Sequence, residues 1–220
     1  MSRAPAMLLA TGVAGSIAFV TNGIASSTAG ADTYSNLNPN PGGTFTGIGL
    51  VIGWFGNGAS RTGSSVTVNG VSATFLARQT SSNATIEIWA CAGTACTDVD
   101  IVLSGAALGL MLDVITFTGA NAPTTATDTA GSTADPSVLT IDVEAGGLII
   151  AGGWCTNGGN STWTNATEAT GSDRTITDSG GNILHQCAAY NASASAQTNL
   201  AVSDNYSVTF VNAGVAVAIR

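Results

Sequence analysis

The sequence predicts an all-β protein, an antiparallel β-sandwich with a jelly-roll-like plan and an extended N-terminal arm. Short β-branched runs and period-two alternation recur along the chain, while no stretch keeps the three- and four-residue apolar spacing of an amphipathic helix. Gly and Asn residues separate these runs, as expected for turns. Apolar residues make up 45% of the 220 residues and charged residues only 8%, so the chain has enough apolar residues to form a core.

Residues 1–43 are predicted to form the N-terminal arm. The arm begins with Met1-Ser2-Arg3, continues with apolar residues to Val20 and reaches Ala29-Gly30-Ala31, which imitates a secretory signal. Glycines and a Thr-Asn-Gly sequence interrupt the apolar run too early for a membrane span of about 20 residues. We therefore expect a structural arm with a first strand over Ser16 to Thr21, and no membrane partner.

Residues 44–220 are predicted to form the β-sandwich domain, in two similar halves of about 44–120 and 137–220. The run Gly49-Leu50-Val51-Ile52-Gly53-Trp54 is echoed by Leu148-Ile149-Ile150-Ala151-Gly152-Gly153-Trp154. This echo predicts comparable core positions for Trp54 and Trp154, unless it is a chance similarity between Gly-rich strands. Residues 121–136, rich in Thr, Ala and Asp, would form the long connection between the halves.

The expected strands of the sandwich domain are short and mostly apolar. They cover residues 48–54, 65–68, 73–77, 84–90, 99–103, 110–117, 138–143, 148–151, 188–190, 206–210 and 215–219. Asn69-Gly70 is the strongest hairpin signal, because both residues accept a positive φ. Small residues alternate with Val and Ile in Val215 to Ile219, which indicates a strand packed closely on both sides or against another subunit.

Four cysteines allow three disulfide connectivities, and the sequence does not choose among them. Cys91 and Cys96 bracket a four-residue loop between two strand-like runs, a spacing that suits two residues opposite each other in a hairpin. Cys155 and Cys187 remain as a second candidate pair. The alternative is that all four are buried thiols.

No catalytic constellation is found, so we predict that the chain is not an enzyme. His185 is the single histidine, so a Ser-His-Asp or Cys-His site would have to be built around it, and no G-x-S-x-G motif is present. We also predict no cofactor and no metal. A structural calcium site at Asp98 and Asp100, or at Asp173 and Asp178, is the alternative, although the EF-hand order is absent.

The charge pattern bears on partners. The chain has no Lys, five Arg and a formal net charge of −8, so the clustered basic residues of a nucleic-acid-binding surface are missing. Lys is also the usual residue that protects an edge strand, so we expect edges to be covered by loops or by neighbouring subunits. Trp89, Trp163 and Tyr190 are candidates for a glycan-binding platform, and core packing is the alternative for these rings.

The order of features over residues 45–220 resembles a group of virion proteins from tailed bacteriophages. The residues that carry the resemblance are Val66 to Thr74, Ile86-Glu87-Ile88-Trp89, Phe117-Thr118-Gly119-Ala120, Asp128-Thr129-Ala130, Glu144 to Ile150 and Val215 to Ile219. Each motif is degenerate alone, and their order carries the weight. The residues before Thr44 and the Cys91 to Cys96 loop depart from the pattern.

The resemblance implies a β-sandwich that is part of a virion, since the group spans capsid decoration, head-fibre and tail-associated proteins. It implies a capsid decoration (cement) protein on the outer surface of the capsid, bound to the major capsid protein and to copies of itself. Alternatives are a tail-fibre or tail-tip subunit, and a secreted carbohydrate-binding module or adhesin with a host-surface glycan as partner. The resemblance carries over no catalytic or ligand residues.

Overall fold

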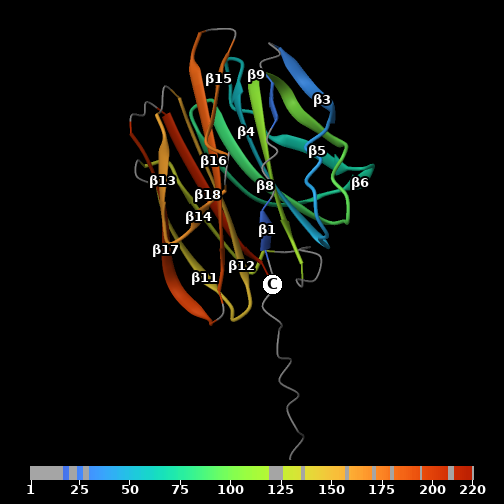
Figure 1. The fold of residues 1–220 in the computed structure, drawn as a ribbon. Coiled ribbons are helices and arrows are strands. Elements are labelled where there is room, and N and C mark those ends of the chain that lie inside the picture. Colours follow the sequence, from blue (N-terminus) through green and yellow to red (C-terminus); the bar gives the residue numbers. More distant parts are fainter. Residues whose placement is uncertain are drawn as a thin grey trace, which may run out of the picture.

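The chain folds entirely into antiparallel strands and loops in the part that the structure describes, which confirms the all-β prediction. The computed structural model describes residues 17–19, 24–26, 30–118, 126–134, 137–156, 159–169, 172–178, 181–193, 195–207 and 211–219. Three sheets, here named A, B and C, stack with sheet B in the middle (Figure 1).

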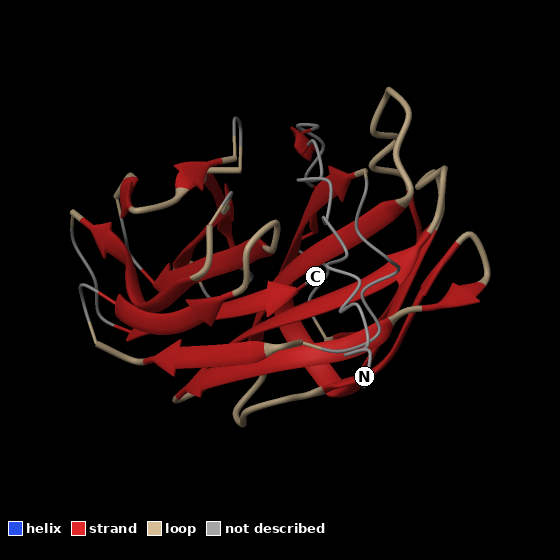
Figure 2. Ribbon diagram, turned by 90° about the horizontal axis from the view of Figure 1, so that it is seen from below, coloured by secondary structure: helices blue, strands red, loops and turns tan. Residues whose placement is uncertain are grey.

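Sheet A comes from the first half of the chain and is curled (Figure 2). Its strands are β1 (Ile17–Phe19), β2 (Ile24–Ser26), β3 (Ala31–Leu37), β4 (Gly47–Gly56), β5 (Gly63–Val68), β6 (Val71–Ser72), β7 (Thr74–Ser81), β8 (Ala84–Ala92) and β9 (Val99–Phe117). Their order is β6-β5-β9-β4-β8-β7. Strands β1, β2 and β3 also pair with β9.

The long strand β9 produces the curl. Its first part pairs with β5 and β3, and its last part pairs with β4 and with β1 and β2. The sequence predicted two strands here, at 99–103 and 110–117, but one strand runs through the Ser-Gly-Ala-Ala segment between them. Small residues allow a strand to bend sharply, so the pairing continues across a segment that has the composition of a turn.

Sheets B and C come from the second half. Sheet B contains β10 (Asp128–Ser132), β12 (Leu148–Thr156), β14 (Thr167–Glu168), β15 (Arg174–Thr177), β16 (Ile183–Ala192) and β18 (Val211–Ile219). Sheet C contains β11 (Ser137–Val143), β13 (Ser161–Thr164) and β17 (Gln197–Tyr206). The predicted connection 121–136 therefore includes a strand, β10, which pairs with β18 through its backbone although it lacks large apolar side chains.

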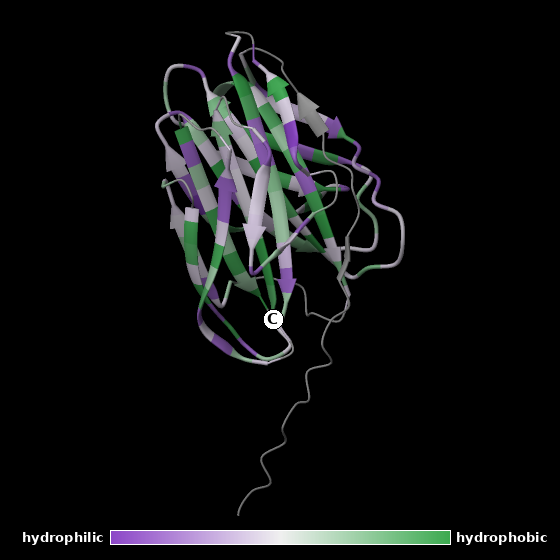
Figure 3. Cartoon of the chain, turned by 60° about the vertical axis from the view of Figure 1, so that its left-hand side comes forward, coloured by the Kyte–Doolittle hydropathy of each residue, from purple (hydrophilic) through white to green (hydrophobic). Residues whose placement is uncertain are grey.

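Three apolar cores hold these layers together, and Figure 3 shows apolar residues concentrated along the strands. Strands β4 and β12 are buried on both faces and are nearly continuously apolar, whereas β11 is buried on one face and alternates. The first lies inside the curl of sheet A and includes Trp54, the second lies between sheets A and B, and the third lies between sheets B and C. Glycines let sheets A and B approach, because a Cβ on Gly53 would overlap the Trp154 ring and one on Gly152 would overlap Val51. The A–B contact thus depends on small residues opposite large ones.

The strand pairings of the two halves follow a common plan. In sheet A, β4 lies between β8 and β9, and in sheet B, β12 lies between β16 and β18. Trp54 and Trp154 are both fully buried, but they occupy different cores, inside sheet A and between sheets A and B. Both tryptophans are therefore core residues, as predicted, although Trp54 points into the curl of sheet A and Trp154 points from sheet B toward sheet A.

Two local predictions can be compared with the structure. Asn69 and Gly70 have φ of 49° and 76° and join Val68 to its partner Val71, which confirms the predicted hairpin. Strand β1 lies within the predicted first strand Ser16 to Thr21 and pairs with the end of β9. Residues 1–16 of the predicted arm lie outside the described residues.

Candidate functional site

Three clusters that contain buried polar side chains among the described residues are candidate sites. The β16 cluster comprises Ser161, Trp163, Asp173, His185, Cys187, Asp204 and Tyr206. The inter-sheet cluster comprises Asp113, Arg174 and Gln186. The rim cluster comprises Gly63, Phe75, Arg78, Glu87 and Trp89.

The β16 cluster lies between sheets B and C and contains a histidine, a thiol and carboxylates. His185 and Cys187 are two residues apart on β16, so both point toward sheet C. The Nε2 atom of His185 pairs with Oδ1 of Asp173, and its ring lies edge-on to the Tyr206 ring with 5.2 Å between centroids. Cys187 Sγ lies 3.1 Å from Tyr206 Oη and 3.7 Å from Asp204 Oδ2.

This arrangement is unsuited to nucleophilic catalysis. Burial, and after it the charge of Asp204, raises the pKa of the Cys187 thiol well above its usual value, so the thiol stays protonated. A nucleophilic cysteine instead needs a depressed pKa and access to substrate, whereas Cys187 is fully buried. Gly153 provides the room, because a Cβ there would overlap the Asp204 carboxylate and lie 2.6 Å from Tyr206 Oη. The cluster therefore packs and orients the B–C interface.

The inter-sheet cluster joins sheets A and B across their core. Gln186 Nε2 donates hydrogen bonds to Asp113 Oδ2 at 2.6 Å and to the backbone oxygen of Val51 at 3.2 Å. Arg174 Nε lies 3.2 Å from Asp113 Oδ1. Burial raises the pKa of Asp113 to about 7, even though Gln186 and Arg174 act in the opposite direction. The interface between the halves therefore contains a carboxyl group that titrates near neutral pH.

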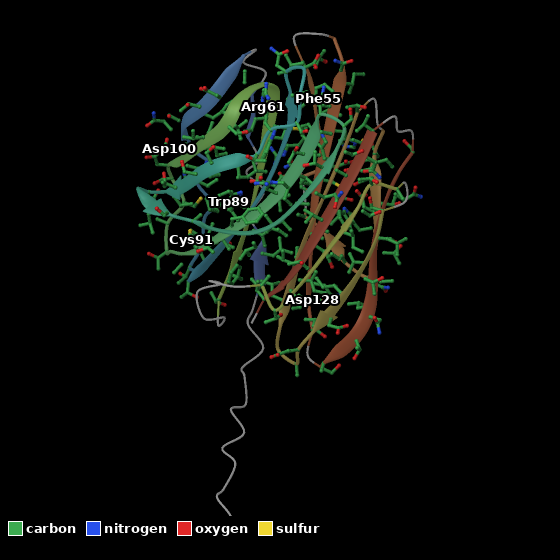
Figure 4. The ribbon with its side chains drawn as sticks, turned by 180° about the vertical axis from the view of Figure 1, so that it is seen from behind. Phe55, Arg61, Trp89, Cys91, Asp100 and Asp128 are labelled. Carbon is green, nitrogen blue, oxygen red and sulfur yellow. The ribbon has the colours of Figure 1, made fainter. Side chains whose placement is uncertain are left out.

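The rim cluster lies in sheet A, where Trp89 projects from β8 (Figure 4). The buried Glu87 carboxylate accepts hydrogen bonds from Gly63 N at 3.0 Å and from Trp89 Nε1 at 2.6 Å, and it pairs with Arg78 Nε. The Arg78 guanidinium carbon lies 5.1 Å from the Phe75 ring centroid, and the Phe75 ring lies edge-on to Trp89 at 5.4 Å. Glu87 thus fixes the orientation of a guanidinium beside a partly exposed aromatic ring.

The candidate disulfide cysteines are found as thiols. Cys91 and Cys96 both lie in the core inside sheet A, and Cys155 and Cys187 both lie between sheets B and C. Burial raises the pKa of Cys91 to about 11 and that of Cys96 to about 12, where the neighbouring Cys91 contributes secondarily. The structure therefore places both candidate pairs, Cys91 with Cys96 and Cys155 with Cys187, in common cores as buried thiols.

The candidate glycan platform is not formed. Trp89 packs into the core inside sheet A, Tyr190 packs against the core between sheets A and B, and Trp163 packs against the cores next to sheet C. The three rings lie on strands of three different sheets. The alternation of side chains along each strand directs these rings toward the cores. Core packing is the alternative that the sequence analysis gave for them.

The candidate calcium ligands serve the fold instead. Asp100 accepts a hydrogen bond from Asn36 N at 2.9 Å, and Asp178 accepts bonds from Asn182 N and Nδ2 at 2.8 and 2.9 Å. Within the described ranges, no group of three or more His, Cys, Asp or Glu side chains is placed to hold a metal ion. These aspartates therefore secure loops and the edge of β3.

Comparisons with known proteins identify no relative. No family model, no curated protein and no solved structure matches this chain. The described part of the chain contains no helix that is long and apolar enough to cross a membrane.

Proposed function

We propose that this chain is a structural protein of a tailed-phage virion, a capsid decoration protein on the outer surface of the shell. It binds as an oligomer to the major capsid protein and stabilises the shell by covering seams between subunits. The observation that carries the proposal is the ordered set of motifs that resembles the virion group.

The described motifs lie on or beside strands of the fold. Val66 to Thr74 forms the β5–β6 hairpin and the start of β7, and Ile86 to Trp89 lies in the central part of β8. Asp128 to Ala130 lies in β10, and Gly146 to Ile150 leads into β12. Val215 to Ile219 ends β18, packed between sheets A and C, which is the two-sided packing that its small residues predict.

The polar chemistry also supports a structural role. The three clusters of buried polar groups each join separate strands, and burial raises the pKa of the Cys187 thiol in the β16 cluster. Buried groups that are bonded to each other rigidify a fold and specify one packing. A rigid, three-layer body is what a shell-stabilising protein requires.

A shell-binding assay tests the proposal. Capsids assembled without this chain are mixed with the purified protein, sedimented and heated, with saturation of binding measured by gel densitometry. The proposal predicts saturable binding at a fixed ratio to capsid subunits and a higher disruption temperature of the loaded shells. Protein that stays in the supernatant at micromolar concentration would contradict it.

The same binding assay distinguishes two other roles from shell decoration. A tail-fibre or tail-tip subunit would bind tails and not shells. A carbohydrate-binding module or adhesin is not favoured by any arrangement of the described rings, since Trp89, Trp163 and Tyr190 pack in separate places. The capsid surface therefore remains the location that we propose.

A further inference from the structure

Four Asn-Gly sequences occur in the chain, and the structure describes two of them, Asn57-Gly58 and Asn69-Gly70. Asn-Gly is prone to spontaneous deamidation, because glycine places no side chain in the way of its own backbone nitrogen. That nitrogen attacks the side-chain amide carbon of the preceding asparagine, so the reaction requires an asparagine side chain that is free to turn toward its own backbone. The two described sequences differ in this respect.

The Asn69 side chain is held by the loop that precedes β9. Its Oδ1 atom accepts hydrogen bonds from Asp98 N at 2.9 Å and from Thr97 N and Oγ1 at 3.1 and 3.2 Å, and its Nδ2 atom donates to Ala95 O at 3.0 Å. The side chain must break these bonds before its amide carbon can approach Gly70 N. The fold therefore protects this Asn-Gly sequence.

The Asn57 side chain has no such support. Asn57 is exposed directly after the end of β4, and its side chain makes no hydrogen bond with the part of the chain that the structure describes. Its backbone is fixed, because Asn57 N donates to Ala106 O at 3.1 Å. Gly58 has a φ of 72°, and a Cβ on it would meet nothing within 4 Å, so space is open next to the attacking nitrogen.

Arg61 adds a cation to the peptide group that reacts. Its Nη2 atom donates to Asn57 O at 3.1 Å, and its Nε atom donates to Ala106 O at 3.3 Å, which fixes the guanidinium in place. Figure 4 shows Arg61 at the same end of the molecule as Phe55. Asn57 O and Gly58 N belong to one peptide group. A charged donor on that oxygen draws electron density from the nitrogen, so the nitrogen loses its proton more easily.

We propose that Asn57 is a site of spontaneous deamidation and isomerisation that Arg61 promotes, while the fold protects Asn69. Gly58 N gives its proton to hydroxide and attacks Cγ of Asn57. As the N–Cγ bond forms, the Cγ–Nδ2 bond breaks, and Nδ2 takes a proton from water and leaves as ammonia. Water then opens the succinimide ring at either carbonyl, which leaves an aspartyl or isoaspartyl residue. Each conversion adds one negative charge beside Arg61, and it requires neither an enzyme nor a role in a virion.

Site-resolved peptide mapping of the full chain tests the proposal. Native protein is incubated at mildly alkaline pH, sampled over time and digested, and mass spectrometry measures the deamidated fraction at each asparagine. A second sample is incubated in urea, where the fold is absent. In the native sample, Asn57 should react at least about tenfold faster than Asn69, because Asn69 must first break its hydrogen bonds. In urea the two sites should react at similar rates.

Two variants separate the effect of the Arg61 charge from that of exposure. Arg61→Gln removes the charge and should slow the reaction of Asn57 in the folded chain. Arg61→Lys keeps the charge and should restore most of the native rate. Neither variant should change the rate in urea, and tryptophan fluorescence establishes that each variant is folded. The comparison of Asn57 with Asn69 in the native chain requires no variant.

Three results would overturn the proposal. Equal rates at Asn57 and Asn69 in the native chain would reject the site. A difference that persists in urea would reject the role of the fold, since the local sequence would then cause it. A folded Arg61→Gln chain that deamidates at the native rate would reject promotion by Arg61. None of these results depends on shell binding.

Discussion

The pH dependence of folding should be governed in part by Asp113. Its pKa is raised from 3.8 to about 7, mainly by burial between sheets A and B. A carboxyl group with a raised pKa in the folded state favours folding when it is protonated, so stability is highest below the unfolded pKa. It falls as the pH rises toward 7 and is level above that. The shift corresponds to about 4 kcal/mol as an upper bound on this fall.

Replacing Asp113 by Asn tests this reasoning, because the amide keeps a hydrogen-bond acceptor for Gln186 but carries no charge. Urea unfolding, followed by tryptophan fluorescence from pH 4 to pH 8.5, gives the free energy of unfolding of the native chain and of Asp113→Asn. The difference between them should change by about 2–4 kcal/mol over this range, in favour of Asn at high pH. The exposed Asp142→Asn is the control. A difference that is constant with pH would refute the assignment.

Three further predictions concern packing and thiol chemistry. Trp154→Ala should lower the free energy of unfolding by about 3–5 kcal/mol, because a fully buried ring is lost from the A–B core; a loss below about 1 kcal/mol in denaturant titration would contradict the packing. Gly153→Ala should cost about 1–3 kcal/mol through its overlap with Asp204. Gly42→Ala, which meets nothing within 4 Å, should be near neutral in the same titration. All four cysteines are buried, so the native protein should resist Ellman's reagent at pH 8 and react at four thiols only when denatured; rapid native labelling would show that the cores open.

The sequence is informative where a strand contains its own apolar pattern. Strands β4, β8, β12 and β18 were predicted within a few residues, as was the Asn69-Gly70 turn. Strands β2, β3, β10, β13, β14 and β15 were not predicted, because they are short or polar and are defined by pairing with a neighbour. Of the predicted strand 206–210, Tyr206 is the last residue of β17, and residues 208–210 lie outside the described part.

The polar clusters show the same limit. The two-residue spacing of His185 and Cys187, and that of Asp204 and Tyr206, indicates that each pair shares a strand face. That the two faces meet depends on how sheet C folds onto sheet B, which no local pattern determines. The distinct cores of Trp54 and Trp154 have the same cause, because the face that becomes covered is chosen by long-range pairing.

We propose that this chain decorates the shell of a phage particle. The most direct test is cryo-electron microscopy of intact virions whose genome encodes it, with the three-sheet body fitted into the density outside the major capsid protein. The account predicts icosahedrally ordered density of this shape on the outer capsid surface. A well-resolved shell without such density would contradict it, and the same body found on the tail would move the protein to adsorption.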